Sequence, residues 1–347
     1  MPFTANELAS ISNGVLDFHI RGQAMSQTIQ DRPLLDAMLK NQKTFGTSKE
    51  FITGPVKGDP TTTIMGYTHD DVVSYANPAN LKRWSYKWYE IHAGISLTGT
   101  ELKQSGISVV DSTTGAKTSQ HSDSEMALLV NLLDDKVDDM MDGWARGMNN
   151  MFWRDGSQDA KVSPGILAFI LDAPTVGVTG GLDRAQNTWW RNRAALAVAS
   201  NSSTWSAQPL ARKLQQEFRQ VRRFGGKPKF FPAGSDFLDA LEMELRTNGT
   251  FTQDGWNKSG KIDLSVSDMS FKGVNLFYDP TLDDLGLAKY AYLLDLKNIK
   301  PYVMEGEDRK MHTPARPADQ YVYYRAMTWT GGMVVDKLNS NEVFSIA

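Results

Sequence analysis

The stretch SDSEMALLVNLLDDKVDDMMDGWARGMNNMF, residues 122–152, has the strongest periodic pattern in this sequence. Its apolar side chains recur at spacings of three and four residues, which is the pattern of a helix with one buried face. This apolar stripe comprises Met126, Leu129, Leu133, Val137, Met140, Trp144, Met148 and Met151, and it is widened by Val130, Met141 and Phe152. With Ser122 or Ser124 as its N-cap and a rise of about 1.5 Å per residue, one spine helix about 45 Å long is predicted.

The opposite face of this predicted helix is acidic, with Asp134, Asp135, Asp138, Asp139 and Asp142. A solvated face is the simplest interpretation, and it suits the helix dipole because Arg146 and Arg154 follow the acids. Two alternatives stay open. The carboxylates could bind a hard cation, or they could dock against Lys82, Arg83 or Lys87 of a neighbouring molecule.

Length and composition restrict the function classes. A chain of 347 residues exceeds the usual size of one compact core, so we expect two lobes or one elongated, multi-lobed subunit. The net charge of -3 argues against a dedicated duplex-binding protein, and the lack of cysteine excludes disulfides and thiolate metal sites. Neither a membrane-spanning apolar run nor a secretory signal is visible, so we expect a protein made in the cytosol with no membrane partner.

No known catalytic or cofactor motif is present in the sequence. The phosphate-binding loop, the dinucleotide fingerprint and the nucleophile elbow are missing, and the glycine cluster GVTGG at 177–181 predicts a turn. The histidines are scattered without metal-ligand spacing. We therefore predict no catalytic residue, no cofactor and no metal site. The tryptophans and acids leave a glycan-active enzyme open as an alternative of a different class.

The N-terminal part of the chain is predicted to be mostly extended. One short helix is expected at 31–42, with Asp31 as a cap and Pro33 in its first turn. Residues 49–90 are rich in Thr, Gly and Pro, which predicts two long strands joined at a distance. The second strand carries alternating aromatic residues, Trp84, Tyr86 and Trp88. Aliphatic residues are too few to bury both faces, so we expect a long arm that lies on a neighbour.

The remaining chain alternates helices and strands. A helix is predicted from 209 to a stop at Gly225, followed by a buried strand at 229–234 and a helix capped by Ser235. From residue 270 onward the pattern is mostly that of β-sheet, and the pair at 331–332, both glycine, permits a bulge or bend. The sequence therefore predicts a mixed lobe and a β-rich C-terminal third.

The order of these parts resembles the major capsid proteins of tailed bacteriophages with the HK97 fold. In that family a spine helix ends near an aromatic-x-Asp-Gly motif, here at 152–156, and a Gly-hydrophobic segment follows, here at 165–167. Next comes a G-G-[IL]-D-R to W-W-R-N stretch, matched within GGLDRAQNTWWRNR at 180–193. The matching residues are Gly180, Gly181, Leu182, Asp183, Arg184, Trp189, Trp190, Arg191 and Asn192.

The resemblance implies an α+β fold with the parts of an HK97-like shell subunit. These parts are an N-terminal arm (1–48), an extended loop (49–105), a peripheral domain containing the spine helix (106–207), an axial domain (208–285) and a return to the peripheral β-sheet (286–347). The implied function is self-assembly into the icosahedral shell that encloses the double-stranded DNA genome of a tailed phage. The shell of a cellular nanocompartment with the same fold is the nearest alternative.

The same resemblance implies the partners and the location. Copies of the chain would form hexameric and pentameric capsomers of a virion capsid that is assembled in the cytoplasm of a host bacterium. The arm is too short to contain a scaffolding segment, so a separate scaffolding protein is expected, together with a portal and a decoration protein. Packaged DNA would be contacted non-specifically, because a slightly negative wall suits DNA that must be pumped in and later ejected.

Residues 180–193 are the main candidate site. We expect the two glycines to let the chain turn and Asp183 and Arg184 to tie that turn by a charge-assisted bond. Trp189 and Trp190 are expected to bury surface between domains or against a neighbour, and packing of both within one subunit is an equal alternative.

The side chains around this site complete the expected contacts. Arg191 and Arg193 are expected to be free for carboxylates of a neighbouring subunit. The full set of candidate inter-subunit or inter-domain contacts is Lys82, Arg83, Trp84, Asp134, Asp138, Asp142, Asp183, Arg184, Trp189, Trp190 and Arg191.

Overall fold

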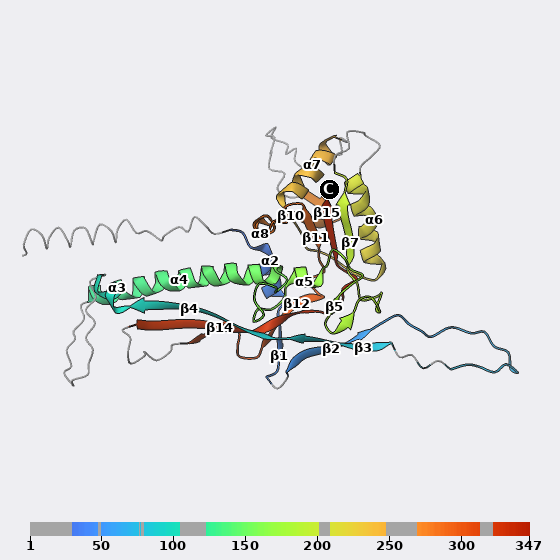
Figure 1. The fold of residues 1–347 in the computed structure, drawn as a ribbon, viewed down its shortest axis with the longest axis horizontal. Coiled ribbons are helices and arrows are strands. Elements are labelled where there is room, and N and C mark those ends of the chain that lie inside the picture. Colours follow the sequence, from blue (N-terminus) through green and yellow to red (C-terminus); the bar gives the residue numbers. More distant parts are fainter. Residues whose placement is uncertain are drawn as a thin grey trace, which may run out of the picture. The chain divides into compact units, whose positions relative to one another are not determined.

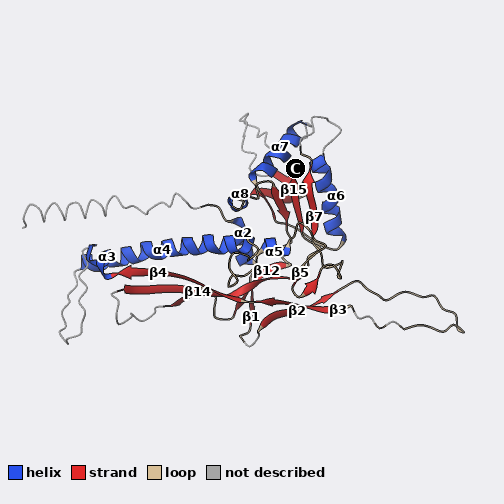
Figure 2. Ribbon diagram, in the orientation of Figure 1, coloured by secondary structure: helices blue, strands red, loops and turns tan. Residues whose placement is uncertain are grey.

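The computed structural model describes residues 30–47, 50–75, 77, 80–104, 123–200, 209–247, 269–312 and 322–347. The chain divides into a small unit, Met1–Asp31, and a large unit, Arg32–Ala347. All elements below belong to the large unit. The first 29 residues of the expected N-terminal arm lie outside the described residues. Helices and sheets are both prominent (Figure 2), which confirms the predicted α+β class.

The predicted spine helix is α4 (Asp123–Trp153), which starts and ends within one residue of the prediction. It runs along strand β4 (Tyr89–Thr98), as Figure 1 shows. Its buried apolar residues include Met140, Trp144, Met148, Met151, Phe152 and Trp153. Met141, which was expected to widen the apolar stripe, is instead 41% exposed. The spacing of the stripe therefore predicted the helix correctly but overestimated the width of its buried face.

A five-stranded sheet lies next to the spine helix in the described part of the chain. Its strands are β1 (Lys43–Phe45), β12 (Ile299–Met304), β14 (Val322–Val335), β13 (Lys310–His312) and β4. The long pairing of β14 with β4 is antiparallel and runs in continuous register from Val322 opposite Thr98 to Gly331 opposite Tyr89. Because these two strands lie far apart in sequence, local sequence patterns cannot specify their pairing.

The glycine pair of β14 allows close approach of backbones instead of a bulge. The ladder with β12 passes through both positions in regular register. A Cβ atom at Gly331 would lie 2.4 Å from the carbonyl oxygen of Tyr302, and one at Gly332 would lie 2.8 Å from that of Lys87. The bulge that the glycine pair would permit is therefore absent, and glycine is required because neighbouring backbones leave no room for a side chain.

A second sheet, six-stranded in the described residues, builds a separate core. Its strands in spatial order are β7 (Arg193–Val198), β15 (Glu342–Ile346), β11 (Tyr290–Leu293), β8 (Phe231–Ala233), β10 (Val274–Tyr278) and β9 (Met269–Phe271). The helix α6 (Pro209–Arg223) packs against β7, and α7 (Ser235–Thr247) packs against β11. Leu210, Leu214 and Phe218 of α6 pack with Phe231 and Phe344 of the sheet in one apolar cluster. The predicted helices at 209 and 235 and the predicted strand at 229–234 are thus confirmed.

The described residues also form four short helices, α2 (Pro33–Lys40), α3 (Gly99–Gln104), α5 (Ile166–Phe169) and α8 (Pro280–Asp284). In α2 the N-cap residue is Arg32 without a side-chain bond, so Asp31 does not cap it as expected, while Pro33 occupies the first turn as predicted. Ser235 is also not a cap, because it is the first residue of α7 and its N–H donates to Asp283 (3.0 Å).

The C-terminal stretch 286–347, expected as one return to a single sheet, is shared between both sheets. Its strands β12, β13 and β14 belong to the five-stranded sheet, whereas β11 and β15 belong to the six-stranded sheet. Likewise β4, expected inside the extended loop at 49–105, pairs with β14 in the five-stranded sheet. The chain crosses between the two sheets at 294–298 and at 336–341.

Candidate functional site

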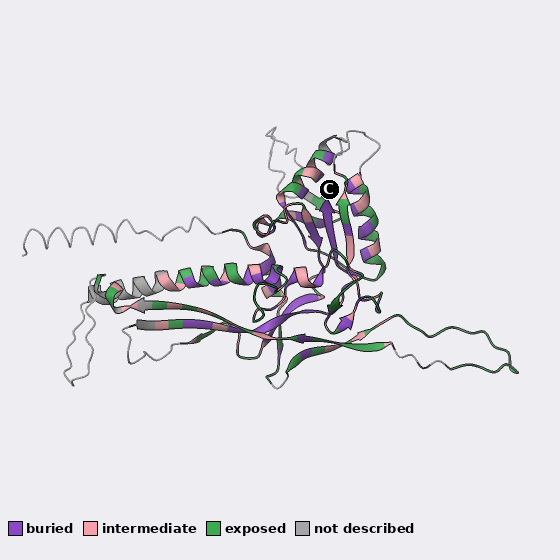
Figure 3. Ribbon diagram, viewed as in Figure 1, coloured by how far each residue is buried: buried purple, intermediate pink, exposed green. Residues whose placement is uncertain are grey.

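A long two-stranded hairpin, separate from the two large sheets, is the main candidate site. Strands β2 (Phe51–Lys57) and β3 (Leu81–Lys87) pair antiparallel, with Phe51 opposite Lys87 and Lys57 opposite Leu81. Beyond β2, residues 59–75 are exposed throughout (Figure 3). We call residues 59–75 the hairpin tip and the paired strands the hairpin base.

The hairpin tip carries apolar side chains that the subunit leaves in solvent. The exposed fractions are 103% for Ile64, 69% for Tyr67, 93% for Val72 and 92% for Tyr75. The described bonds of the tip stay within the hairpin, such as the one from the Thr68 hydroxyl to Asp71 (2.7 Å) and the one from the Asn80 side chain to the Asp59 carbonyl (3.2 Å). Such a concentration of exposed apolar residues is typical of a segment that binds another molecule.

The hairpin base is buried on one face only. Trp84 and Tyr86 alternate with exposed neighbours on β3 and are 5% and 7% exposed. Their ring centroids lie 5.4 Å apart. A Cβ atom at Gly54, opposite Trp84 in the ladder, would lie 2.2 Å from the Trp84 ring. Gly54 therefore lets the Trp84 indole lie flat across β2.

The glycine turn of the sequence motif rests against this buried face. Residues 177–193, which we call the anchor segment, begin with a small hairpin of β5 (Val178–Thr179) and β6 (Leu182–Asp183). Gly180 and Gly181 form its turn with φ values of 59° and 76°, so the predicted turn is confirmed. The Gly180 carbonyl accepts a hydrogen bond from the Ser85 N–H (2.9 Å), and a Cβ atom at Gly180 would lie 2.8 Å from the Tyr86 hydroxyl.

Arg184 is the buried centre of the anchor segment. It is 0% exposed, and its guanidinium donates to the Thr179 hydroxyl (2.8 and 3.0 Å), the Asn192 side-chain oxygen (2.7 Å) and the Phe169 carbonyl (2.6 Å). Burial lowers the pKa of Arg184 to about 10, so it remains charged at neutral pH. The arginine thus ties α5, β5 and the end of the anchor segment together.

Arg184 does not form the predicted bond with Asp183. The Asp183 carboxylate accepts the N–H of Ala185 (2.8 Å) instead, in a local turn. Strand β6 ends at Asp183 and Arg184 begins a turn, in which the guanidinium is taken up by Thr179, Asn192 and the Phe169 carbonyl. The sequence identified the right residues here but the wrong partners.

The two tryptophans also pack within the subunit. Trp190 is 1% exposed and its ring N–H donates to the Thr179 carbonyl (3.0 Å). Trp189 is half-buried, with its ring 5.9 Å from that of Trp190. A Cβ atom at Gly58 would lie 2.9 Å from the Trp189 ring, so this indole covers the end of β2. The sequence left two arrangements open for Trp190: burial inside one subunit, or burial between domains or at an interface. The structure shows burial inside the subunit.

Polar side chains attach the remaining edge of the hairpin base. Lys82 of β3 donates to the Asn187 side-chain oxygen (2.6 Å), and Arg83 beside it is exposed. Arg191 donates to the carbonyl oxygens of Arg184 (2.7 Å) and Ala185 (3.0 Å). The anchor segment therefore holds this edge of the base through the Lys82–Asn187 bond, while Arg191 ties the anchor segment to itself.

Arg193 is not free for a neighbour, because it pairs with Glu217 of α6 (2.6 Å). Lys213 also pairs with Glu217 (2.8 Å), and the buried Glu342 lies opposite Arg193 in the β15–β7 ladder. Burial and the charge of Glu217 raise the pKa of Glu342 to about 9. Both carboxyl oxygens of Glu342 are buried without a hydrogen-bond partner among the described residues, so burial favours the neutral, protonated acid.

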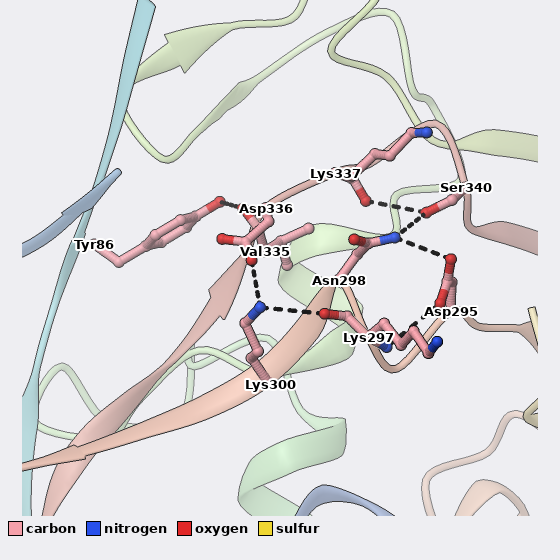
Figure 4. A network of polar contacts seen from close by, with 9 residues as sticks. All are labelled: Tyr86, Asp295, Lys297, Asn298, Lys300, Val335, Asp336, Lys337 and Ser340. Carbon is pink, nitrogen blue, oxygen red and sulfur yellow. Dashed lines mark hydrogen bonds and ion pairs between the residues drawn. The ribbon is translucent and has the colours of Figure 1, made fainter. Parts of the chain in front are cut away.

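The hairpin base is connected to both crossings between the sheets (Figure 4). The Tyr86 hydroxyl donates to the Val335 carbonyl (3.2 Å), where β14 ends. Next to it Asp336 pairs with the buried Lys300 (2.5 Å), and its N–H donates to the Asn298 carbonyl (2.8 Å). Burial and the nearby charge of Asp336 raise the pKa of Tyr86, so its hydroxyl stays protonated as a donor.

The two crossings are joined directly by a second set of bonds. The Asn298 side-chain nitrogen donates to Asp295 (2.9 Å) and to the Ser340 hydroxyl (3.2 Å). The Asp295 N–H donates to the Asn341 side chain (2.8 Å). We call this set the sheet junction, and it fixes both crossings next to the hairpin base.

The acidic face of the spine helix is solvent-accessible where it is described. Asp138 is exposed and Asp142 half-buried, and the side chain of Asp134 lies outside the described residues. Within the described part of the chain, no group of three or more His, Asp or Glu side chains is placed to hold a metal ion. The search of that same part for a helix long and apolar enough to cross a membrane also finds none.

The sequence did not single out several residues that build the site. In the sequence, Gly54 and Gly58 are only part of a Gly-rich, turn-forming composition. In the structure, each leaves room for an indole ring. Asn187, which accepts a hydrogen bond from Lys82, and Glu342 gave no signal. Asn192 was singled out as a motif residue, but its bonds to Arg184 and to Leu171 were not predicted. Their roles depend largely on neighbours distant in the sequence, which a local pattern does not contain.

Solved structures with this fold come from phages and related particles. A cyanophage A-1(L) capsid chain aligns with a TM-score of 0.65, covering 93% of this chain and 94% of that chain at 15% identity. A chain from the capsid of an empty GTA particle aligns with a TM-score of 0.55, covering 93% and 100% at 12% identity. A chain of Mycobacterium phage Bobi aligns with a TM-score of 0.53, covering 100% and 99% at 11% identity.

No family model and no curated protein matches this sequence. At these identities the alignments establish the fold alone. They cover nearly all of each chain. The chain therefore has the HK97-like fold of these capsid structures.

Proposed function

We propose that this chain is a major capsid protein that self-assembles into the icosahedral shell around the double-stranded DNA genome of a tailed phage. The observation that carries the proposal is the contrast within the hairpin. Its base is fixed by the anchor segment, whereas its tip exposes Ile64, Tyr67 and Val72 with no partner surface in the described subunit. A rigid base with an apolar tip is suited to reach a second copy of the chain.

The fold supports the same conclusion. The similar structures named above include capsid chains of a cyanophage and of a GTA particle, aligned over more than nine-tenths of their length. The proposed role is mechanical: each copy contacts several neighbours, and closure of the shell makes many weak contacts persistent.

The parts of the subunit follow from this role. The five-stranded sheet with α4 would be the peripheral domain, and the six-stranded sheet with α6 and α7 the axial domain. Hexameric and pentameric capsomers, a scaffolding protein, a portal, a decoration protein and non-specifically contacted DNA are the proposed partners. The spine-helix acids Asp138 and Asp142 would face Arg83 or Lys87 of a neighbour.

Electron microscopy of the full chain, expressed alone and with a candidate scaffolding protein, tests the proposal. Closed shells or capsomer rings are expected. The variant Ile64→Ser/Val72→Ser should stay folded but form no shells, because the tip would no longer offer apolar surface to a neighbour. The control Leu196→Ser/Met311→Ser removes exposed apolar side chains elsewhere, 41% and 47% exposed, and should retain shells. A wild-type chain that stays monomeric under both conditions would contradict the proposal.

A further inference from the structure

A patch of cationic side chains lies where α6 ends. It combines three segments: the last turn of α6, the loop to β8 and the turn between β9 and β10. Its members are Arg222, Arg223, Lys227, Lys229 and Lys272, and all of them are exposed. None of them forms an ion pair with a described carboxylate. This is an uncompensated positive patch on a chain whose net charge is -3.

Part of this patch is concave. Arg222, Lys227 and Lys229 line a pocket of about 400 Å³, which we call the basic pocket. The other lining residues are Gly225, Gly226, Pro228, Gly273 and Val274. A Cβ atom built at Gly273 would meet nothing within 4 Å, so the space beside this residue is open. Small residues between cationic side chains allow the oxygens of an anion to approach the backbone.

The cations are held in place without being neutralised. The Arg222 guanidinium lies 4.5 Å from the centre of the Phe218 ring, and the Lys272 ammonium lies 5.7 Å from the same ring. Phe218 is 2% exposed and therefore a fixed support. A ring attracts cations through its quadrupole and leaves their net charge available to a ligand.

The other charged groups near the pocket do little to neutralise its positive charge. Asp295 is the carboxylate bonded to the loop, through the Lys227 N–H (3.1 Å), but it is 4% exposed and belongs to the sheet junction. Lys337 adds a cation next to the loop by donating to the Phe224 carbonyl. The dipole of α6 explains basic residues in its last turn, such as Arg222, but not Lys227, Lys229 or Lys272, which lie beyond the helix.

We propose that the basic pocket binds a phosphate group. A phosphate offers several anionic oxygens in a compact volume, and arginine and lysine donate charge-assisted hydrogen bonds to them. The phosphates of DNA and a free polyphosphate present the same chemistry to the pocket. DNA phosphates would make the pocket a local contact to nucleic acid on a subunit whose overall charge is unfavourable for DNA binding.

The test compares two variants of the full chain in which the same number of positive charges is removed. The pocket variant is Arg222→Gln/Lys227→Gln/Lys229→Gln. The control variant is Lys40→Gln/Lys43→Gln/Lys161→Gln, which removes three exposed lysines elsewhere. Pyrophosphate binding is measured by calorimetry, and binding of a short labelled DNA duplex by fluorescence anisotropy over a range of salt concentrations. Thermal unfolding and electron microscopy report folding and assembly of the same preparations.

The expected result is a loss of affinity in the pocket variant of at least about tenfold, since one hydrogen bond to a charged group contributes this much. If DNA is the source of the phosphate, the slope of log K against log salt should also become shallower, by about 0.9 for each phosphate that the variant no longer neutralises. If only pyrophosphate binding falls, the source is a free polyphosphate. The control variant should bind like wild type in both assays.

Two results would overturn the proposal. The first is a wild-type chain that binds neither probe, and the second is a pocket variant that binds both probes as tightly as wild type. If that variant also forms no shells, the patch is assigned to an acidic protein surface. Because shells are scored separately, failure of phosphate binding with intact shells leaves the capsid proposal standing.

Discussion

The base and the tip of the hairpin both carry aromatic and aliphatic side chains, but in opposite environments. At the base, Trp84 and Tyr86 are 5% and 7% exposed. At the tip, Tyr75 is 92% exposed. The difference comes from distant segments that cover only the base: the anchor segment, about 100 residues later in the sequence, and the Phe169 ring and the end of β14, which contact Tyr86. Burial of an aromatic residue in an extended hairpin is therefore decided by what the rest of the chain brings to it.

Removal of the buried arginine should have the largest effect on this contrast. Arg184→Ala would leave Thr179, Asn192 and the Phe169 carbonyl without this donor and should lower the free energy of unfolding by about 3–5 kcal/mol. Chemical denaturation of unassembled subunits measures it. Arg184→Lys keeps the charge with fewer donors and should be less destabilised. A change below about 1 kcal/mol for Arg184→Ala would show that the anchor segment does not depend on this residue.

A glycine substitution in the base should have the next largest effect, and a matched substitution in the tip is its control. Gly54→Val should cost about 1–3 kcal/mol, because its side chain would collide with the Trp84 ring. Gly66→Val is the matched control, since a Cβ atom there would meet nothing within 4 Å. Faster cleavage by chymotrypsin at the base is expected for the first variant only. Equal cleavage of both variants would refute the close packing of Trp84 on β2.

The buried carboxyl group of Glu342 makes the free energy of unfolding depend on pH. Its folded pKa of about 9 lies above the unfolded value of 4.5, so the folded chain keeps a proton that the unfolded chain releases. The unfolding free energy of wild type should therefore fall as pH rises from 4.5 towards 9. Glu342→Gln abolishes this titration and should be more stable than wild type by up to about 3 kcal/mol at pH 7.

Thermal unfolding from pH 5 to pH 9 measures the gain of Glu342→Gln, which should increase across this window. Glu305→Gln, which changes an exposed carboxylate, is the control and should show no such trend. A gain that stays constant with pH would mean that Glu342 is ionised in the folded chain.

Changes at the tip should have the smallest effect on the subunit. Ile64→Ser/Val72→Ser should alter the free energy of unfolding by less than about 0.5 kcal/mol, because both side chains are exposed. Denaturation of unassembled subunits gives the value. A large destabilisation would mean that the tip packs on its own subunit and would remove the contrast between base and tip.

Local sequence patterns predicted the regular elements well. The stripe of α4 and the glycine turn at 180–181 are encoded in neighbouring residues, and both are confirmed. Predictions of partners were less successful. Asp183 was assigned to Arg184 and Arg193 to a neighbouring subunit, whereas the observed partners are the Ala185 N–H and Glu217.

The sequence by itself determined the spine helix, the glycine turn, the extended hairpin and the lack of recognisable catalytic motifs. These features depend on periodicity and on the conformational range of individual residues, which are local properties. Only the tertiary structure decided that Arg184 is a buried hub, that Gly54 and Gly58 accommodate tryptophan rings, and that β4 pairs with β14. Each of these depends on contacts between segments far apart in the chain, and many different pairings satisfy the same local pattern. The energy of packing and hydrogen bonding selects one of them.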